Sequence, residues 1–295
     1  MAAKTTGEGY LLSRDYIDCT RLNLQHHLWT QMFGYLLHPN ILPNTPPEIL
    51  KIADIGTGTG VWLTDLASQL PDSTQLDGFD VDTSQAPPKE WLPANVVIRQ
   101  WDIFTEVPDE LIEQYDVVNV RLLVFVLRED PLPVLRRLIK LLKPGWWLQW
   151  AEPDVPSMRI TKTNSLNTET ALHRLFTLTA AQDPRLVPHW PSQLPTLLAD
   201  QGMKQVYAHH VNAKPRKLDS PVFGTSLLLT MMRYQDQEFA MHECNLLIYD
   251  MIAHSGAGIG DQANEISRLV PEAARESKGG VMFAFPRLTV IGRKA

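Results

Sequence analysis

The strongest constraint on this chain is a short apolar run, Lys51–Ile55, that leads into glycines at every second position: Gly56, Gly58 and Gly60. Glycine permits positive φ angles and lets a ligand approach main-chain N–H groups without a Cβ in the way. Placed between a strand and a helix that begins near Val61, such a turn favours a bound nucleotide-like ligand. The lysine and hydroxyl residue of a phosphate-binding loop do not follow, and the spacing also differs from the dinucleotide pattern.

Strands and helices are expected to alternate after this turn, which predicts βαβ units. The expected fold is therefore α/β, a Rossmann-like doubly wound sheet of seven mostly parallel strands, in which ligands bind beyond the carboxyl ends of the strands. The sequence predicts strands at 52–55, 74–80, 96–102, 115–121, 146–151 and 204–211, one closing strand at 279–292, and helices at 10–38, 61–69, 131–142, 168–181, 192–201 and within 222–255.

The helical segments that flank or interrupt the sheet suggest caps on one integrated domain. We expect a helical N-terminal cap at 1–48 and a Rossmann-like core at 49–155 and 196–295. Helical lid insertions over a substrate pocket are expected at 156–195 and 219–262.

Composition excludes several function classes. With a net charge of −6 and no long run of Lys or Arg, the chain is not expected to bind nucleic acid. No apolar window approaches the length of a membrane span, and the N-terminus lacks the apolar core of a signal peptide, so we expect no membrane association and a cytoplasmic location. Two cysteines and no clustered ligand spacing predict neither a disulfide framework nor a metal site.

Acids stand where the next two strands are expected to end. Asp80, followed by Val81, lies roughly 20 residues beyond the last glycine, where an acid can accept hydrogen bonds from both hydroxyls of a ribose. Asp102, followed by Ile103, ends the third expected strand. The alternatives are a solvated turn or a helix cap for Asp80 and a helix cap for Asp102.

These motifs resemble those of class I S-adenosylmethionine-dependent methyltransferases. The resemblance rests on Asp-x-Gly-x-Gly-x-Gly from Asp54, the two strand-end acids, the segment 115–121 and the Leu-Lys-Pro-Gly turn at 142–145. The N-terminal segment, with Tyr10, Arg21 and Gln25, resembles fungal secondary-metabolite methyltransferases, a group that includes small-molecule N- and O-methyltransferases and a global regulator of secondary metabolism. The resemblance covers most of residues 10–155 and fades beyond them.

The resemblance implies S-adenosylmethionine as cofactor and S-adenosylhomocysteine as product. Arg21 would pair with the methionine carboxylate, or else with Asp15 or Asp18 on its own helix, and Trp146, in place of the family's second glycine, would either enter the pocket or pack in the core. The implied cofactor-binding residues are Tyr10, Arg21, Asp54, Gly56, Gly58, Gly60, Asp80, Val81, Asp102, Ile103, Asn119, Val120 and Arg121.

The implied function is methyl transfer to an N, O or S atom of a small, largely apolar natural product. His189, in the proline-rich loop 183–191, is the first candidate for a general base. A cofactor-binding regulator and a methyltransferase-like pericyclase remain as alternatives, and a homodimer is left open. Aromatic and Met residues of the helical segments suggest an apolar pocket, although their helical spacing favours core packing for most of them: Trp29, Phe33, Phe223, Met231, Met232, Tyr234 and Met251.

Overall fold

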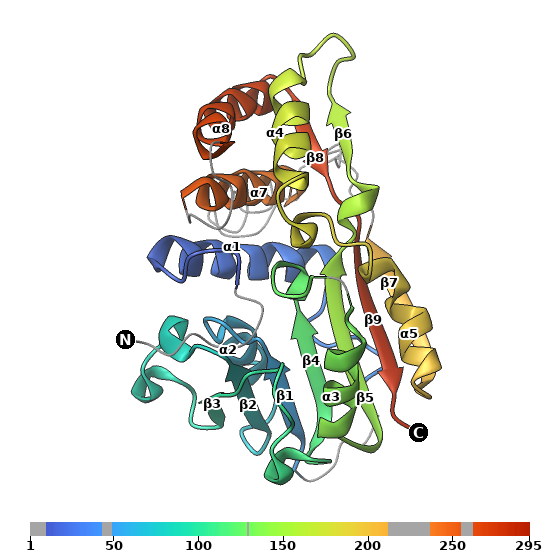
Figure 1. Ribbon diagram of the computed structural model, residues 1–295. Coiled ribbons are helices and arrows are strands. Elements are labelled where there is room, and N and C mark those ends of the chain that lie inside the picture. Colours follow the sequence, from blue (N-terminus) through green and yellow to red (C-terminus); the bar gives the residue numbers. More distant parts are fainter. Residues whose placement is uncertain (1–9, 43–48, 129, 212–236, 255–261) are drawn as a thin grey trace, which may run out of the picture.

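The computed structural model describes residues 10–42, 49–128, 130–211, 237–254 and 262–295. Its main sheet has seven strands in the order β3-β2-β1-β4-β5-β9-β7 (Figure 1). Strands β1 to β5 pair in parallel, and β9 runs antiparallel to both β5 and β7. The strands are β1 Lys51–Ile55, β2 Gln75–Asp80, β3 Val96–Gln100, β4 Tyr115–Arg121, β5 Leu142–Pro153, β7 Lys204–Val211 and β9 Arg287–Arg293. The predicted Rossmann-like α/β fold is confirmed.

Helices cover the sheet on both faces because successive strand residues point to opposite sides. Ala53 and Val118 contribute to one core cluster, together with α3 (Leu132–Leu141) and α5 (Leu194–Asp200). Their neighbours Ile52 and Val117 belong to another cluster, together with α2 (Val61–Ala67). The carboxyl ends of the parallel strands are therefore held between two packed layers.

A second group of elements lies beyond one end of the sheet. Figure 1 shows α1 (Tyr16–Phe33) lying across that end, with α7 (Gln237–His254), α4 (Thr170–Ala180) and α8 (Ala263–Lys278) beyond it. A two-stranded antiparallel sheet joins β6 (Arg159–Lys162) to β8 (Val281–Ala284). Helix α1 contacts α7 through Leu28, Met241 and Cys244. The predicted division into cap, core and lids stays a prediction.

Local chemistry makes the first helix shorter than the predicted 10–38. The side chain of Asp15 accepts hydrogen bonds from the N–H groups of Ile17 and Asp18, which caps α1 at its N-terminus. Gly34 follows the last turn with φ 80°, the left-handed conformation that ends many helices. Residues 10–15 are therefore free to fold back beside the helix.

One prediction about the second half is wrong, and two elements there were missed. The expected single closing strand at 279–292 is two strands, β8 and β9, which pair in different sheets on either side of Phe285 and Pro286. Pro286 lacks an N–H donor for a strand ladder, which suits such a break. Strand β6 and helix α8 were not predicted, and residues Phe223, Met231, Met232 and Tyr234 lie outside the described part of the chain.

The Lys-Pro-Gly segment belongs to β5 rather than to a turn before it. The register between β4 and β5 shifts between Tyr115 and Val117, and Gly145 has φ 80° at this irregularity. Trp146 packs against both core clusters and is not among the residues that line the large cavity described below. Its packing alternative therefore holds. Within the described residues, no helix combines the length and apolar character needed to cross a membrane.

Candidate functional site

The glycine turn after β1 requires glycine for its backbone conformation. Gly56, Gly58 and Gly60 have φ angles of 72°, 53° and 72°. Residues other than glycine adopt such angles only with backbone strain. The N–H groups of Gly56 and Thr57 donate to the carbonyl of Phe79, and the N–H of Gly58 donates to Oδ2 of Asp80 at 2.9 Å. The turn is thus fixed to the end of β2.

A cavity of about 440 Å³, here called the glycine-turn cavity, lies beside this turn. The structure brings eleven of the predicted cofactor residues to its wall: Tyr10, Arg21, Asp54, Gly56, Gly58, Asp80, Val81, Asp102, Ile103, Asn119 and Arg121. Gly60 caps the N-terminus of α2, and Val120 is fully buried in the core; neither lines the cavity. The site lies where parallel strands end, as such folds favour.

The two strand-end acids keep acceptor capacity toward this cavity. Asp80 accepts from Gly58 N–H and, at 3.2 Å, from Asp82 N–H, and burial raises the pKa of its carboxyl. Oδ1 of Asp102 accepts from Phe104 N–H at 2.9 Å, so this acid fixes the turn that follows it. A carboxylate has about four lone-pair positions, which leaves room for a ligand on each acid.

Asp54 is tied to the centre of the sheet by a chain of amides. Its Oδ1 accepts from Asn119 Nδ2 at 2.7 Å, and Asn119 Oδ1 accepts from Gln149 Nε2 at 2.9 Å. Gln149 also donates to the carbonyl of Leu36 and accepts from His38 N–H, beyond the C-terminus of α1. Burial raises the pKa of Asp54 to about 6, and the hydrogen bond from Asn119 opposes that rise.

Arg21 is buried and already well supplied with partners. Its Nε and Nη2 donate to Asp18 Oδ1 at 3.0 and 2.6 Å, and its Nη1 donates to Gln25 Oε1 at 2.7 Å. Nη2 also donates to the hydroxyl of Tyr10 at 3.0 Å. Of the alternatives for Arg21, the pairing with Asp18 is present in the structure, and the pair is buried rather than on the helix surface.

Arg121 is the last residue of β4 and lines the cavity. Its Nη2 lies 3.0 Å from Nδ1 of His26, and its guanidinium lies 5.9 Å from the ring centre of Trp29. Burial lowers the pKa of Arg121 to about 10, against the attraction of the Asp54, Glu152 and Asp65 carboxylates. The side chain therefore stays cationic at neutral pH.

Glu152 does not line the cavity, but it holds a loop on the cavity wall, and the sequence reasoning missed it. Its Oε1 accepts from Leu123 N–H at 2.8 Å and from Trp150 Nε1 at 2.7 Å, and burial raises its pKa to about 8. The loop that it holds begins at Leu122, a residue in the left-handed region at φ 64°. The available signal was an acid at the end of an apolar strand, where an unpaired carboxyl is costly.

A second, smaller cavity of about 50 Å³ lies between α1 and α7, and we call it the α7 chamber. Leu122 and Phe125 line both cavities and so form a shared wall. Most of the chamber is apolar, and the side chain of Arg287 on its wall is ion-paired with Glu238 at 2.9 Å. The other residues that line the chamber are Gln25, Trp29, Pro153, Val155, Leu186, Met241, Asn245, Ile248, Tyr249 and Phe285.

The predicted base is not brought to the site. His189 is exposed and lines neither cavity. The loop that carries it is anchored by its neighbour Trp190, which is buried in the core against Trp150. Packing of Trp190 thus leaves His189 at the surface.

Comparison with known proteins gives relatives of one kind. No protein-family model matches the chain. Methyltransferase grgD of a Penicillium species is 40% identical over 173 residues, which are 53% of this chain and 59% of that protein. N-methyltransferase tcpN of Claviceps purpurea is 27% identical over 234 residues, 77% of this chain and 81% of that protein. N-methyltransferase verN of Clonostachys rogersoniana is 33% identical over 150 residues, 49% of this chain and 50% of that protein.

The chain spans 59% of the length of grgD and 50% of the length of verN. Among solved structures, phosphoethanolamine N-methyltransferase 2 of Haemonchus contortus superposes with a TM-score of 0.48 at 16% identity, over 95% of this chain and 59% of that chain. In sequence, the chain therefore resembles fungal methyltransferases, two of which are named N-methyltransferases.

Proposed function

We propose that this protein is an S-adenosylmethionine-dependent methyltransferase that acts on an N, O or S atom of a small, largely apolar product of secondary metabolism. One observation carries the proposal: the glycine turn, Asp80 and Asp102 line a single cavity at the carboxyl ends of β1, β2 and β3. Those groups suit an adenosine. The N-methyltransferase names of two relatives favour nitrogen as the acceptor atom.

The cavity residues fit the parts of this cofactor in order along the strand ends. Asp80 would accept from the ribose hydroxyls, and Asp102 from the adenine amino group, with Trp101 and Ile103 beside the ring. Gly56 and Gly58 leave space for close approach of the ligand to the main chain. The bound cofactor supplies an activated sulfonium methyl group, and the protein contributes alignment and exclusion of water.

The α7 chamber supports an apolar, uncharged acceptor. Its aromatic walls include Trp29, Phe125 and Tyr249, and its cation, Arg287, is neutralised by Glu238. A negatively charged acceptor would find no unpaired cation on the chamber's described wall. The chamber is small, so we infer that it receives the apolar end of an acceptor whose reacting atom lies at the shared wall of Leu122 and Phe125.

No histidine lines either cavity among the described residues. The proposed reaction therefore uses no histidine base from these walls and suits an acceptor that needs none. An acidic amide N–H, a thiol or an unprotonated amine meets that requirement.

Mass spectrometry tests the proposal. Purified protein with S-adenosylmethionine and a panel of uncharged aromatic metabolites should yield a product heavier by one CH₂ unit and an equal amount of S-adenosylhomocysteine. The Asp80→Ala variant provides the matched inactive control. Cofactor binding without methyl transfer to any panel member would favour the regulator or pericyclase alternative, and absence of cofactor binding would contradict the proposal outright.

A further inference from the structure

Arg121 differs from the other buried arginine of the glycine-turn cavity in how few partners it has. A guanidinium carries five N–H donors. In the described part of the chain, Arg121 makes one hydrogen bond, to His26, and no carboxylate oxygen lies within 4.0 Å of it. Arg21, in contrast, uses donors toward Asp18, Gln25 and Tyr10. Of the two buried arginines that line the cavity, Arg121 is therefore the one with donors to spare for a ligand.

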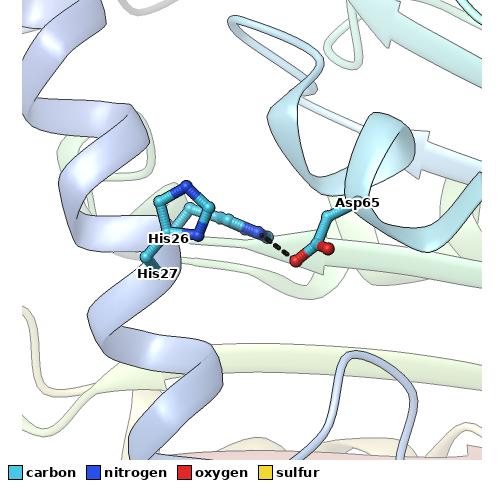
Figure 2. A group of neighbouring side chains, drawn as sticks. All are labelled: His26, His27 and Asp65. Atoms are coloured by element: carbon cyan, nitrogen blue, oxygen red, sulfur yellow. Dashed lines mark hydrogen bonds and ion pairs between the residues drawn. The ribbon is translucent and has the colours of Figure 1, made fainter. Parts of the chain in front are cut away.

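A relay of two further side chains orients Arg121. Figure 2 shows His26 directed from α1 toward Asp65 on α2, and Nε2 of His26 lies 3.0 Å from Oδ2 of Asp65. Arginine can only donate, so Nδ1 of His26 must accept a hydrogen bond from Arg121. Nε2 of His26 must then be protonated and donate a hydrogen bond to Asp65. Burial and the neighbouring Arg121 lower the pKa of His26 to about 4, which keeps the ring neutral in this arrangement.

The same tautomer argues against a metal site at this place. Ligand atoms of His26, His27 and Asp65 lie within 4.8 Å of one another, a spacing that could hold a cation (Figure 2). A metal needs a lone pair on the ligating nitrogen. Nδ1 of His26 spends its lone pair on Arg121, and Nε2 is protonated. The hydrogen-bond chain therefore uses His26 as an orienting group.

Opposite charges meet at this end of the cavity. Asp54 and Arg121 both line it and attract each other electrostatically, but no ion pair joins them. An amino-acid group carries an ammonium and a carboxylate on one carbon, so it requires an acid and a cation side by side. Asp80 and Asp102 occupy the other strand ends, which leaves this end for the amino-acid part of a ligand.

We propose that Arg121 binds the carboxylate of the cofactor's amino-acid end, and that His26 and Asp65 are positioning residues for Arg121. This inference rests on the proposed function and revises the expectation that Arg21 makes the contact. Arg21 instead organises Tyr10 and the start of α1 at the cavity wall.

Calorimetry with two ligands that differ only by the carboxylate tests the assignment. The probes are S-adenosylhomocysteine and S-adenosyl-3-thiopropylamine, its decarboxylated counterpart. Arg121→Gln should lower the affinity for S-adenosylhomocysteine by about 10- to 100-fold, as expected for a charged hydrogen bond worth about 1.5–3 kcal/mol. It should change the affinity of the second by less than about twofold. Arg268→Gln, at an exposed site on α8, is the matched control.

The positioning role has its own matched pair on one helix. His26→Ala should lower the affinity for S-adenosylhomocysteine by only about 3- to 10-fold, because an unoriented arginine still carries its charge. The affinity for the decarboxylated ligand should not change. His27→Ala removes an exposed neighbour and should change neither affinity.

The outcomes separate this inference from the function on which it rests. Equal losses for both ligands in Arg121→Gln, or no loss for either, would overturn the carboxylate assignment while the cofactor proposal stands. Similar losses in both histidine variants, with zinc binding to the wild type, would overturn the relay in favour of a metal site. If the wild type binds neither ligand, the cofactor proposal itself fails.

Discussion

The glycine-turn cavity and the α7 chamber share the wall formed by Leu122 and Phe125, yet they are lined by different chemistry. The cavity is bordered by acids and arginines that hydrogen bonds hold in place, such as Asp80 and Arg121. The chamber is bordered by packed aromatic and aliphatic side chains. The contrast implies that single polar groups govern ligand affinity in the cavity, whereas volume and packing govern the chamber and the stability of the helices around it.

The largest expected effect is in the cavity. Asp80→Ala should lower the affinity for S-adenosylhomocysteine by about 100-fold or more, because two charged hydrogen bonds of about 1.5–3 kcal/mol each would be lost. The fold should persist, since Asp80 lies at a strand end. Calorimetry and urea unfolding measure the two quantities. Asp72→Ala, in an exposed turn, is the control, and unchanged affinity in a folded Asp80→Ala protein would remove the ribose assignment.

A chamber substitution should show the reverse pattern. Ile248 on α7 is 5% exposed and lines the chamber. Ile248→Ala should lower the free energy of unfolding by about 2–4 kcal/mol through lost packing. Its affinity for S-adenosylhomocysteine should stay within about twofold.

Urea unfolding and calorimetry again provide both readouts. Ile49→Ala, at a residue that is 56% exposed, should cost less than about 0.5 kcal/mol. A large loss of cofactor affinity in Ile248→Ala would show that the two regions are not energetically separate.

The carboxyl of Glu152, which supports the loop of the shared wall, should give an effect that depends on pH. Glu152 has a pKa of about 8 in the folded protein against the ordinary glutamate value of 4.5, so the folded state binds its proton more tightly. The carboxyl therefore favours folding most at low pH, and that contribution is lost as the pH rises from about 4.5 to 8. Glu152→Gln should flatten this part of the stability profile.

Urea unfolding at several pH values across that window measures the slope. Glutamine can still accept from Leu123 N–H and Trp150 Nε1 through its one oxygen, so the wall should stay in place. Glu110→Gln, at an exposed acid, should leave the slope unchanged. An equally steep profile in Glu152→Gln would mean that this carboxyl does not titrate in that range.

Much of the main sheet was predictable because its signals are local. The run Lys51–Ile55, the glycines after it and the helix from Val61 follow one another directly in sequence. Each of them favours its own backbone conformation. Strand β7 was likewise predicted with its observed bounds. The pairing of β6 with β8 was not predicted, because it joins segments more than 100 residues apart. Nothing in either segment indicates which strand it pairs with.

The same distinction holds for the cavity. The positions of Asp54, Asp80 and Asp102 follow from strands that end at a common edge. The roles of Gln149 and Glu152 do not, because each depends on partners brought in by packing. Gln149, for example, reaches His38 across 111 residues of sequence.

The sequence alone determined where the backbone must take left-handed turns and where the parallel strands present their acids, since those properties belong to short segments. The tertiary structure decided which charges remain available to a ligand. Asp18 neutralises Arg21 within one helix, whereas Arg121 meets a neutral His26 that lies 95 residues away. Burial makes the partner of each arginine decisive for ligand binding, because charges that are shielded from water interact more strongly with the groups beside them.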